Sequence, residues 1–297
     1  MRRVIHMAAL NVKFENHDFH KPENYVELFN LLHNNRITGK YKRITLGGLK
    51  VLGIREHDGE DFIYGEYLRC TDIDTTCSWY DIDEHKQILD EEGNPIQQVE
   101  NNKKPNYESS VFIFIPNGHR FFYDKKMFPT NSILSPNSMK KLLEVLFSNS
   151  IVEEKFGTIQ VEVETDEDTI DKIINAPRKK TLFVEFTIPN GDHLSDLSKK
   201  VLDRAKSMNL ASYNEAYKSI ADRELLIDDE AKAKIQIAAS NGHVTLKSYD
   251  NHGKIAVIST KDYPLETTIE YDENRSTHHN ELVNGAFGFF RRLIKRG

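Results

Sequence analysis

The segment VFIFIPNGHRFFY, residues 111–123, indicates most clearly how this chain folds. Its two short runs of β-branched and aromatic residues flank Pro116-Asn117-Gly118-His119, which has the composition of a tight turn between antiparallel strands. Large apolar side chains stabilise a strand when neighbouring side chains cover them. We therefore predict a buried antiparallel hairpin near the middle of the chain.

Segments on the N-terminal side of this hairpin predict further strands and a helix. Residues 44–55 and 62–70 are predicted strands, joined by an Asp-Gly turn at residues 57–60. Apolar residues alternate over residues 4–14, as they do in a half-buried strand, and apolar residues at helical spacing follow Pro22. The first part of the chain is therefore predicted to form an antiparallel sheet with helices packed on it.

The remainder of the chain alternates between predicted strands and helices. A helix that begins at Pro136 ends before Asn149-Ser150, where we place a boundary between two units. This order predicts an α+β fold with mixed, mostly antiparallel sheets and packed helices. We expect an N-terminal α+β domain at 1–150, with an exposed acidic insertion at 74–106. A C-terminal α+β domain at 151–297 is expected to end in a basic helix.

The composition excludes several classes of protein. The chain has 297 residues and a net charge of −6, from 40 Lys and Arg against 46 Asp and Glu. No apolar run approaches the roughly 18 residues that a membrane-spanning helix requires, so membrane insertion is excluded. Cys70 and Cys77 are too few for a disulfide framework or a four-thiolate zinc site. No apolar signal segment follows the charged start, and we expect a cytoplasmic protein.

Short runs of lysine and arginine are the candidate nucleic-acid-binding residues. Basic side chains neutralise phosphates and release counterions, which attracts nucleic acid of any sequence. At the C-terminal end, the alternative is an amphipathic helix whose basic residues favour the negative end of its dipole. The residues to which we assign phosphate contact are Lys40, Lys42, Arg43, Arg178, Lys179, Lys180, Arg291, Arg292, Lys295 and Arg296.

An acidic cluster offers a different function, that of a metal-dependent nuclease. Clustered carboxylates hold Mg²⁺, which activates water and stabilises the leaving oxygen in phosphodiester hydrolysis. Acidic loops are also commonly solvated surfaces without a ligand. In this alternative the candidate catalytic residues are Asp72, Asp74, Asp81 and Asp83.

Two histidines form a second metal candidate. His17 and His20 lie within one short segment, and a zinc site would need further ligands from elsewhere in the chain. The sequence has no glycine-rich phosphate loop, no Gly-x-Ser-x-Gly elbow and no His-Glu-x-x-His motif. Apart from Mg²⁺ in the nuclease alternative, we expect no cofactor.

Several stretches carry a resemblance to a known family. In addition to the strand-helix opening, they are Thr71-Asp72-Ile73-Asp74, Ser78-Trp79-Tyr80-Asp81, Pro116-Asn117-Gly118-His119, Ser135-Pro136-Asn137, Ala238-Ala239-Ser240-Asn241-Gly242 and Ser259-Thr260-Lys261-Asp262-Tyr263-Pro264. With these stretches the chain resembles a bacterial domain-of-unknown-function family, number 4747. More distantly, the order of elements in residues 157–297 resembles that of RexA, a prophage exclusion protein. The second resemblance implies a dimeric, DNA-binding α+β fold that acts in phage defence with a membrane-protein partner.

The leading expectation is a non-enzymatic, sequence-nonspecific nucleic-acid-binding component of bacterial anti-phage defence, of the abortive-infection type. We expect it to bind DNA as a homodimer, with a second defence protein as a further partner. One alternative is the metal-dependent nuclease or toxin effector at residues 72–84. The other is a protein-interaction regulator whose acidic insertion docks on a basic partner.

Overall fold

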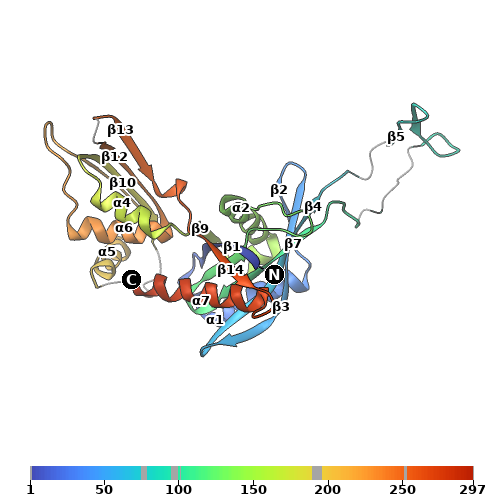
Figure 1. The fold of residues 1–297 in the computed structure, drawn as a ribbon, viewed down its shortest axis with the longest axis horizontal. Helices are drawn as coiled ribbons and strands as arrows, with labels where there is room; N and C mark the ends of the chain where they lie inside the picture. Colours follow the sequence, from blue (N-terminus) through green and yellow to red (C-terminus); the bar gives the residue numbers. More distant parts are fainter. Residues whose placement is uncertain are drawn as a thin grey trace.

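The structure is a computed structural model that describes residues 2–74, 79–94, 100, 102–188, 196–250 and 253–296. For His17, Glu167 and residues 294–296 it describes the backbone only. The described residues form two antiparallel sheets with helices packed against them, and a separate small hairpin (Figure 1). The predicted α+β fold with mostly antiparallel sheets is confirmed.

A large antiparallel sheet occupies the centre of the molecule (Figure 1). In spatial order its strands are β14 (Glu266–Asp272), β1 (Arg2–Phe14), β8 (Arg120–Asp124), β7 (Glu108–Ile115), β4 (Glu60–Thr71), β3 (Thr45–His57) and β2 (Thr38–Lys42). An eighth strand, β9 (Ile159–Val163), pairs with the second half of β1, and β14 pairs with the first half. Two strands from the C-terminal half of the chain therefore complete the sheet that the N-terminal half builds.

Helices cover both faces of the large sheet. On one face lie α1 (Pro22–Asn34), α2 (Pro136–Phe147) and α3 (Ser150–Phe156), and on the other lies α7 (His278–Arg296). Along β1, Met7 and Ala9 are buried toward α7, while Ala8 and Leu10 are buried toward the other three helices. The prediction of a half-buried strand is therefore wrong, because a helix from the end of the chain returns to cover its second face.

The two predicted hairpins of the N-terminal half and the helix predicted to begin at Pro136 are confirmed. β7 and β8 pair in antiparallel register around η2 (Pro116–Gly118), and β3 pairs with β4 around the Asp-Gly turn. α2 begins as its sequence indicates, because the Ser135 side chain accepts a hydrogen bond from the Ser138 N–H and Pro136 occupies the first helical position. Strands β2, β11 and β14 have no counterpart among the predicted elements, and neither does the small hairpin within the acidic insertion.

A second antiparallel sheet of four strands lies beside the first (Figure 1). Its order is β11 (Ser212–Lys218), β10 (Lys179–Thr187), β12 (Gly242–Tyr249) and β13 (Ile255–Ser259). Its helices are α4 (Glu167–Asn175), α5 (Asp196–Ser207) and α6 (Asp229–Asn241). Leu182, Val184 and Phe186 alternate along β10 and are buried against these helices. The boundary that we predict near residue 150 stays a prediction. β9, β14 and α7 follow residue 150 in the chain, yet the two strands pair within the large sheet and the helix packs on it.

The acidic insertion contains a small hairpin of its own. β5 (Trp79–Asp81) and β6 (Lys86–Ile88) pair with each other and form a third sheet, drawn apart from the other two in Figure 1. Most described residues between 79 and 94 are exposed.

The short helices η1 (His17–Phe19) and η3 (Thr260–Asp262) complete the described elements. None of the described helices combines the length and apolar character needed to cross a membrane.

Candidate nucleic-acid interface

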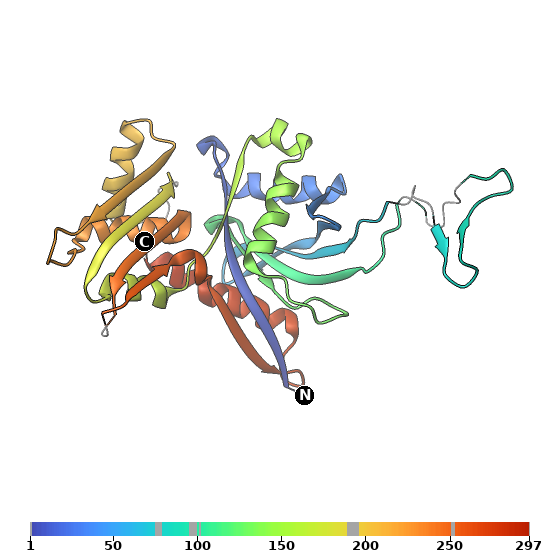
Figure 2. The ribbon, with the colours of Figure 1, turned by 90° about the horizontal axis from the view of Figure 1, so that it is seen from above.

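The second sheet has one covered face and one open face. In the described part of the chain, α4, α5 and α6 pack on the side to which Leu182, Val184 and Phe186 point, and Figure 2 views the sheet from the opposite side. Successive side chains of a strand point to opposite faces. Phe183 and Glu185 therefore lie on the open face, which consists of the outward positions of all four strands.

Phe183 lies at the centre of the open face among small neighbours. In the ladder it pairs with Ala216 of β11 on one side and Thr245 of β12 on the other. Its side chain is half-buried, and its ring centroid is 5.6 Å from that of His243, the next outward residue of β12 on that side. The small side chains of Ala216 and Thr245 leave part of the Phe183 ring accessible on the open face.

Two exposed lysines flank the row of the open face next to Phe183. Thr181 pairs with Lys218 on β11 and with Lys247 on β12, and both lysines are exposed. They lie two strand spacings apart, about 10 Å, because neighbouring strands are about 4.8 Å apart. Lys218 and Lys247 therefore lie on either side of β10, in the row of the sheet next to Phe183.

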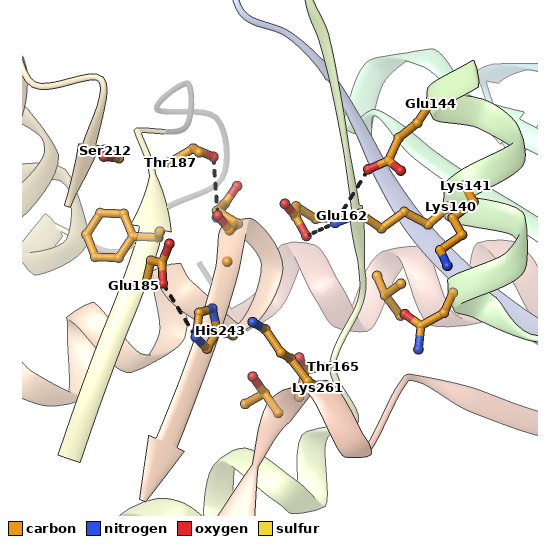
Figure 3. A pocket seen from close by; sticks show the side chains of 16 residues that line it. Lys140, Lys141, Glu144, Glu162, Thr165, Glu185, Thr187, Ser212, His243 and Lys261 are labelled. Atoms are coloured by element: carbon orange, nitrogen blue, oxygen red, sulfur yellow. Dashed lines mark hydrogen bonds and ion pairs between the residues drawn. The ribbon is translucent and has the colours of Figure 1, made fainter. Parts of the chain in front are cut away.

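At its other end the open face runs into a cleft of about 580 Å³. Figure 3 shows side chains of α2 on one wall, side chains of β10, β12 and η3 on the opposite wall, and Glu162 of β9 between them. The ionisable residues that line the cleft are Lys140, Lys141, Glu144, Glu162, Glu185, His243 and Lys261. The cleft is thus a polar continuation of the sheet face, formed only because the two sheets lie side by side.

Charges in the cleft are partly paired. Lys140 Nζ lies 2.8 Å from Glu162 Oε2 and 3.8 Å from Glu144 Oε1. Burial raises the pKa of the Glu144 carboxyl, and the charge of Lys140 opposes this shift. Lys141 and Lys261 are exposed at the surface of the cleft. These two ammonium groups are the ones best placed to meet a phosphate group.

The first predicted basic group, at the turn between β2 and β3, lies on the large sheet. Lys40 Nζ is 3.0 Å from Asp72 Oδ2, so its charge is already matched by a carboxylate. Lys42 Nζ lies 5.7 Å from the centroid of the Tyr41 ring, and Arg43 is exposed. This group is at the edge strand of the large sheet, on a different sheet from Phe183.

The second predicted group lies at the start of β10, on the same sheet as Phe183. Lys179 Nζ donates to the Ala176 carbonyl at 2.6 Å, and Lys180 Nζ donates to the Arg223 carbonyl at 2.7 Å. Arg178 is exposed just before the strand. Of the three predicted groups, this one is nearest in the fold to the open face.

The third predicted group is on α7, against the far face of the large sheet. Arg291 forms an ion pair with Asp58, and the guanidinium of Arg292 lies 3.9 Å from the centroid of the Phe289 ring. The side chains of Lys295 and Arg296 lie outside the described residues. The three predicted groups thus belong to three separate parts of the fold: the β2 edge of the large sheet, the start of β10 and the end of α7.

The predicted acidic residues have individual partners. Lys104 and Lys40 bind Asp72 and lower the pKa of its carboxyl. Asp81 Oδ1 accepts the backbone N–H groups of Asp83 and Glu84, both at 2.9 Å. Asp74 directly precedes residues 75–78, which lie outside the described residues.

The two predicted metal-binding histidines differ in what the structure describes. In His20, Nε2 contacts the Phe14 carbonyl oxygen and Nδ1 contacts the Tyr25 hydroxyl. Both of its ring nitrogens therefore have protein partners, and the side chain of His17 lies outside the described residues. Among the residues that the structure describes, no three His, Cys, Asp or Glu side chains form a group that could hold a metal ion.

The residues of the open face and cleft were absent from the predicted site. Alternation in β10, with Leu182, Val184 and Phe186 facing one way, is the signal that could have placed Phe183 on the other face. β11 lacks a comparable pattern, because its covered face carries Tyr213, Glu215 and Tyr217 rather than aliphatic residues. Their polar groups bond to each other and to Lys234 of α6, so the strand has no continuous apolar side.

Comparison with known proteins supports the family resemblance. Residues 3–286 match the family described as domain of unknown function DUF4747, which covers nearly the whole chain. No curated protein matches the sequence. The match includes both sheets, the acidic insertion and the first part of α7. This chain is therefore a member of the DUF4747 family.

Proposed function

We propose that this protein binds single-stranded nucleic acid without sequence preference on the open face of its second sheet. One observation carries the proposal: an accessible aromatic ring and exposed lysines share an uncovered sheet face that leads into a charged cleft. The predicted basic run 178–180 adjoins this face at the start of β10. Phosphate binding therefore remains the mechanism, and the residues that perform it share one face of the second sheet.

The chemistry of the open face suits a single strand. Lysines attract the phosphate backbone of any sequence, and an aromatic ring can stack on any unpaired base because every base has a π-face. Bases in a duplex are stacked on each other and do not present that face. Phe183 would take a base, Lys218 and Lys247 would lie beside the backbone, and the strand would continue toward Lys141 and Lys261.

We propose that the protein performs this binding as part of a bacterial defence against phage. The RexA-like order of elements in residues 157–297 supports a role in bacterial anti-phage defence in the cytoplasm. A homodimer and a second defence protein are the partners that this resemblance implies. DNA is the ligand that it implies, and the open face suits single-stranded DNA as well as RNA.

The test is the anisotropy of short fluorescent oligonucleotides titrated with the purified chain. We expect single strands of unrelated sequence to bind with similar affinity and more tightly than duplexes. The logarithm of the association constant should fall linearly with the logarithm of salt concentration. Phe183→Ala should weaken binding by about 5- to 150-fold, because a base stacked on an aromatic side chain contributes roughly 1–3 kcal/mol.

Charge reversal separates this surface from the rest of the molecule. Lys218→Glu and Lys247→Glu should weaken binding to every sequence about equally and reduce the salt dependence, by roughly 0.7 in slope for each phosphate that is no longer neutralised. The matched control is Lys200→Glu, an exposed lysine of α5 on the covered side of the same sheet. Binding that is insensitive to salt, or an equal loss of affinity in the control, would contradict the proposal.

A further inference from the structure

His243 lies at the point where the open face enters the cleft. It is the ladder partner of Glu185, and its Nε2 lies 3.5 Å from Glu185 Oε2. The His243 side chain is 16% exposed and that of Glu185 is 43% exposed, so the histidine is the more enclosed of the two. Figure 3 shows Lys261 beside the imidazole on the side that faces the cleft. A ring with a carboxylate on one side and an ammonium group on the other thus faces a cavity large enough for a nucleotide.

The groups around His243 favour the neutral imidazole. Burial lowers the pKa of His243 below its ordinary value of 6.5, and the charge of Lys261 on η3 adds to this shift. Glu185 on β10 and Glu162 on β9 oppose it, while Lys140 on α2 acts in the same direction as Lys261. A neutral imidazole can accept a proton at neutral pH, as a general base must.

We propose that the cleft cleaves RNA, with His243 as general base and Lys261 as the group that serves the leaving oxygen. This inference rests on the proposed binding of single strands and goes beyond it, since it gives the chain an activity. RNA is the substrate class because its own 2′-hydroxyl supplies the nucleophile. DNA lacks this group and would be bound without being cut.

The reaction balances without an added co-reactant. His243 takes the proton of the 2′-hydroxyl while the 2′-oxygen forms a bond to the adjacent phosphorus. The bond between phosphorus and the 5′-oxygen breaks, and that oxygen leaves with the electron pair and takes a proton from the ammonium group of Lys261. The products are a 2′,3′-cyclic phosphate and a 5′-hydroxyl end. Exchange of protons with water then restores His243 and Lys261.

Two further residues support the geometry. Glu185 would hold the imidazole in position and stabilise the imidazolium that forms, as carboxylates beside catalytic histidines do. Lys141 of α2 is exposed on the wall of the cleft opposite His243. It would contact the phosphate backbone of the RNA and hold the substrate across the cleft. Glu185 is thus a positioning residue, because it acts through His243.

The experiment compares an RNA oligonucleotide with a DNA oligonucleotide of the same sequence, in the presence of a metal chelator. We expect RNA to be cut to products with 2′,3′-cyclic phosphate ends, and DNA to be bound but intact. His243→Asn should lower the cleavage rate by about 10²- to 10⁴-fold. The far-ultraviolet circular dichroism of this variant should equal that of the parent, which reports that the variant is folded. His85→Asn, at an exposed histidine beyond β5, is the matched control and should cut RNA as the parent does.

The dependence of the rate on pH distinguishes a general base from a structural histidine. The rate should rise with pH through a midpoint below 6.5, the ordinary value for histidine. Glu185→Gln should move this midpoint lower, because Glu185 raises the pKa of His243. RNA that is bound but not cut would overturn the cleavage inference and leave the binding proposal standing. Cutting that His243→Asn leaves unchanged would also overturn it, and failure to bind either oligonucleotide would overturn both proposals.

Discussion

Lys13 of β1 donates a hydrogen bond from Nζ to Oδ1 of Asn241, the last residue of α6, although 228 positions separate them in the sequence. Both side chains are buried. Beside them, Asn11 Nδ2 donates to the Ser240 carbonyl at 3.0 Å, and Ser240 Oγ donates to Glu164 Oε2 at 2.9 Å. This polar seam joins the two sheets directly behind the cleft, and Asn241 lines the cleft itself.

The first prediction concerns the pH dependence of stability at Lys13. Burial, together with the charge of Arg120, lowers the pKa of Lys13 to about 7 from 10.5. Between these values the unfolded chain binds more protons than the folded chain, so the free energy of unfolding should rise with pH, by at most about 1.4 kcal/mol per pH unit. Urea unfolding of the parent and of Lys13→Met at several pH values measures this slope, and the variant should lose it. Lys42→Met, at an exposed lysine, should keep the slope, and an unchanged slope in Lys13→Met would disprove the assignment.

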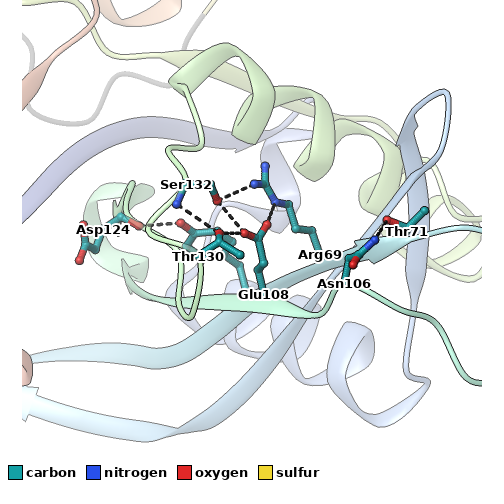
Figure 4. A network of polar contacts seen from close by, with 8 residues as sticks. Arg69, Thr71, Asn106, Glu108, Asp124, Thr130 and Ser132 are labelled. Carbon is teal, nitrogen blue, oxygen red and sulfur yellow. Dashed lines mark hydrogen bonds and ion pairs between the residues drawn. The ribbon is translucent and has the colours of Figure 1, made fainter.

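The second prediction concerns an ion pair on the large sheet in which Glu108 is buried and Arg69 is partly exposed. Arg69 of β4 binds the Glu108 carboxylate, and the Ser132 hydroxyl donates to the same carboxylate at 2.8 Å (Figure 4). Arg69→Met should lower the free energy of unfolding by about 3 kcal/mol, because it leaves a buried carboxylate without its countercharge. The double variant with Glu108→Gln should be destabilised by less than the sum of the two single variants.

The control for this pair is an exposed one. Lys103 and Glu100 form a salt bridge in which both side chains are about two-thirds exposed. Lys103→Met should change the free energy of unfolding by less than about 1 kcal/mol, since solvent screens such pairs. If Arg69→Met and Lys103→Met had equal effects, burial would not be what makes the first pair important.

The third prediction concerns the packing of α7 on the large sheet at Gly118. A Cβ atom at Gly118, in the turn between β7 and β8, would overlap the ring of Phe290 on α7. Gly118→Ala should lower the free energy of unfolding by about 1–3 kcal/mol, as overpacking of a core does. Adding Phe290→Leu should recover part of this stability by making room for the methyl group. Gly53→Ala, where no atom lies within 4 Å of the added Cβ, should have a much smaller effect. Additive effects in the double variant would show that the two residues do not meet.

The fourth prediction concerns the start of α7. His278 Nε2 lies 2.9 Å from Asp124 Oδ2, and Asp124 Oδ1 accepts the N–H groups of His6 and Lys126, both at 3.1 Å. Asp124→Ala should lower the free energy of unfolding by about 2–4 kcal/mol, because several donors lose their acceptor together. His278→Ala removes a single hydrogen bond and should cost less. Hydrogen exchange should become faster at the first turn of α7 in both variants, and protection there equal to that of the parent would refute the role of this interaction.

Local sequence patterns are sufficient to predict much of the secondary structure. The hairpin of β7 and β8 follows from a turn between two apolar runs, and α2 follows from Ser135, Pro136 and the helical spacing of apolar residues. These elements are decided by neighbours within a few positions, so the sequence is sufficient to predict them. β11 and β14 carry alternating polar residues, and their pairing depends on strands far away in the chain.

The candidate site was less predictable for the same reason. Runs such as Lys40-Tyr41-Lys42-Arg43 are visible in the sequence, yet the fold places Lys40 against Asp72 and Arg291 against Asp58. The number of basic residues does not show which of them have carboxylate partners. Lys218 and Lys247 are single lysines in the sequence, and the strand register brings them to either side of Thr181.

The residues alone determine the antiparallel hairpins, the amphipathic helices, the α+β class and the membership of the family, because each depends on short-range patterning or on direct similarity. The pairing of Lys13 with Asn241, the burial of β1 on both faces and the meeting of Lys140, Glu162 and His243 around one cleft were decided by the tertiary structure. Interactions of this kind join segments that lie far apart in the sequence. They arise from which sheet edges and helix faces become buried together, and local sequence patterns do not encode that choice.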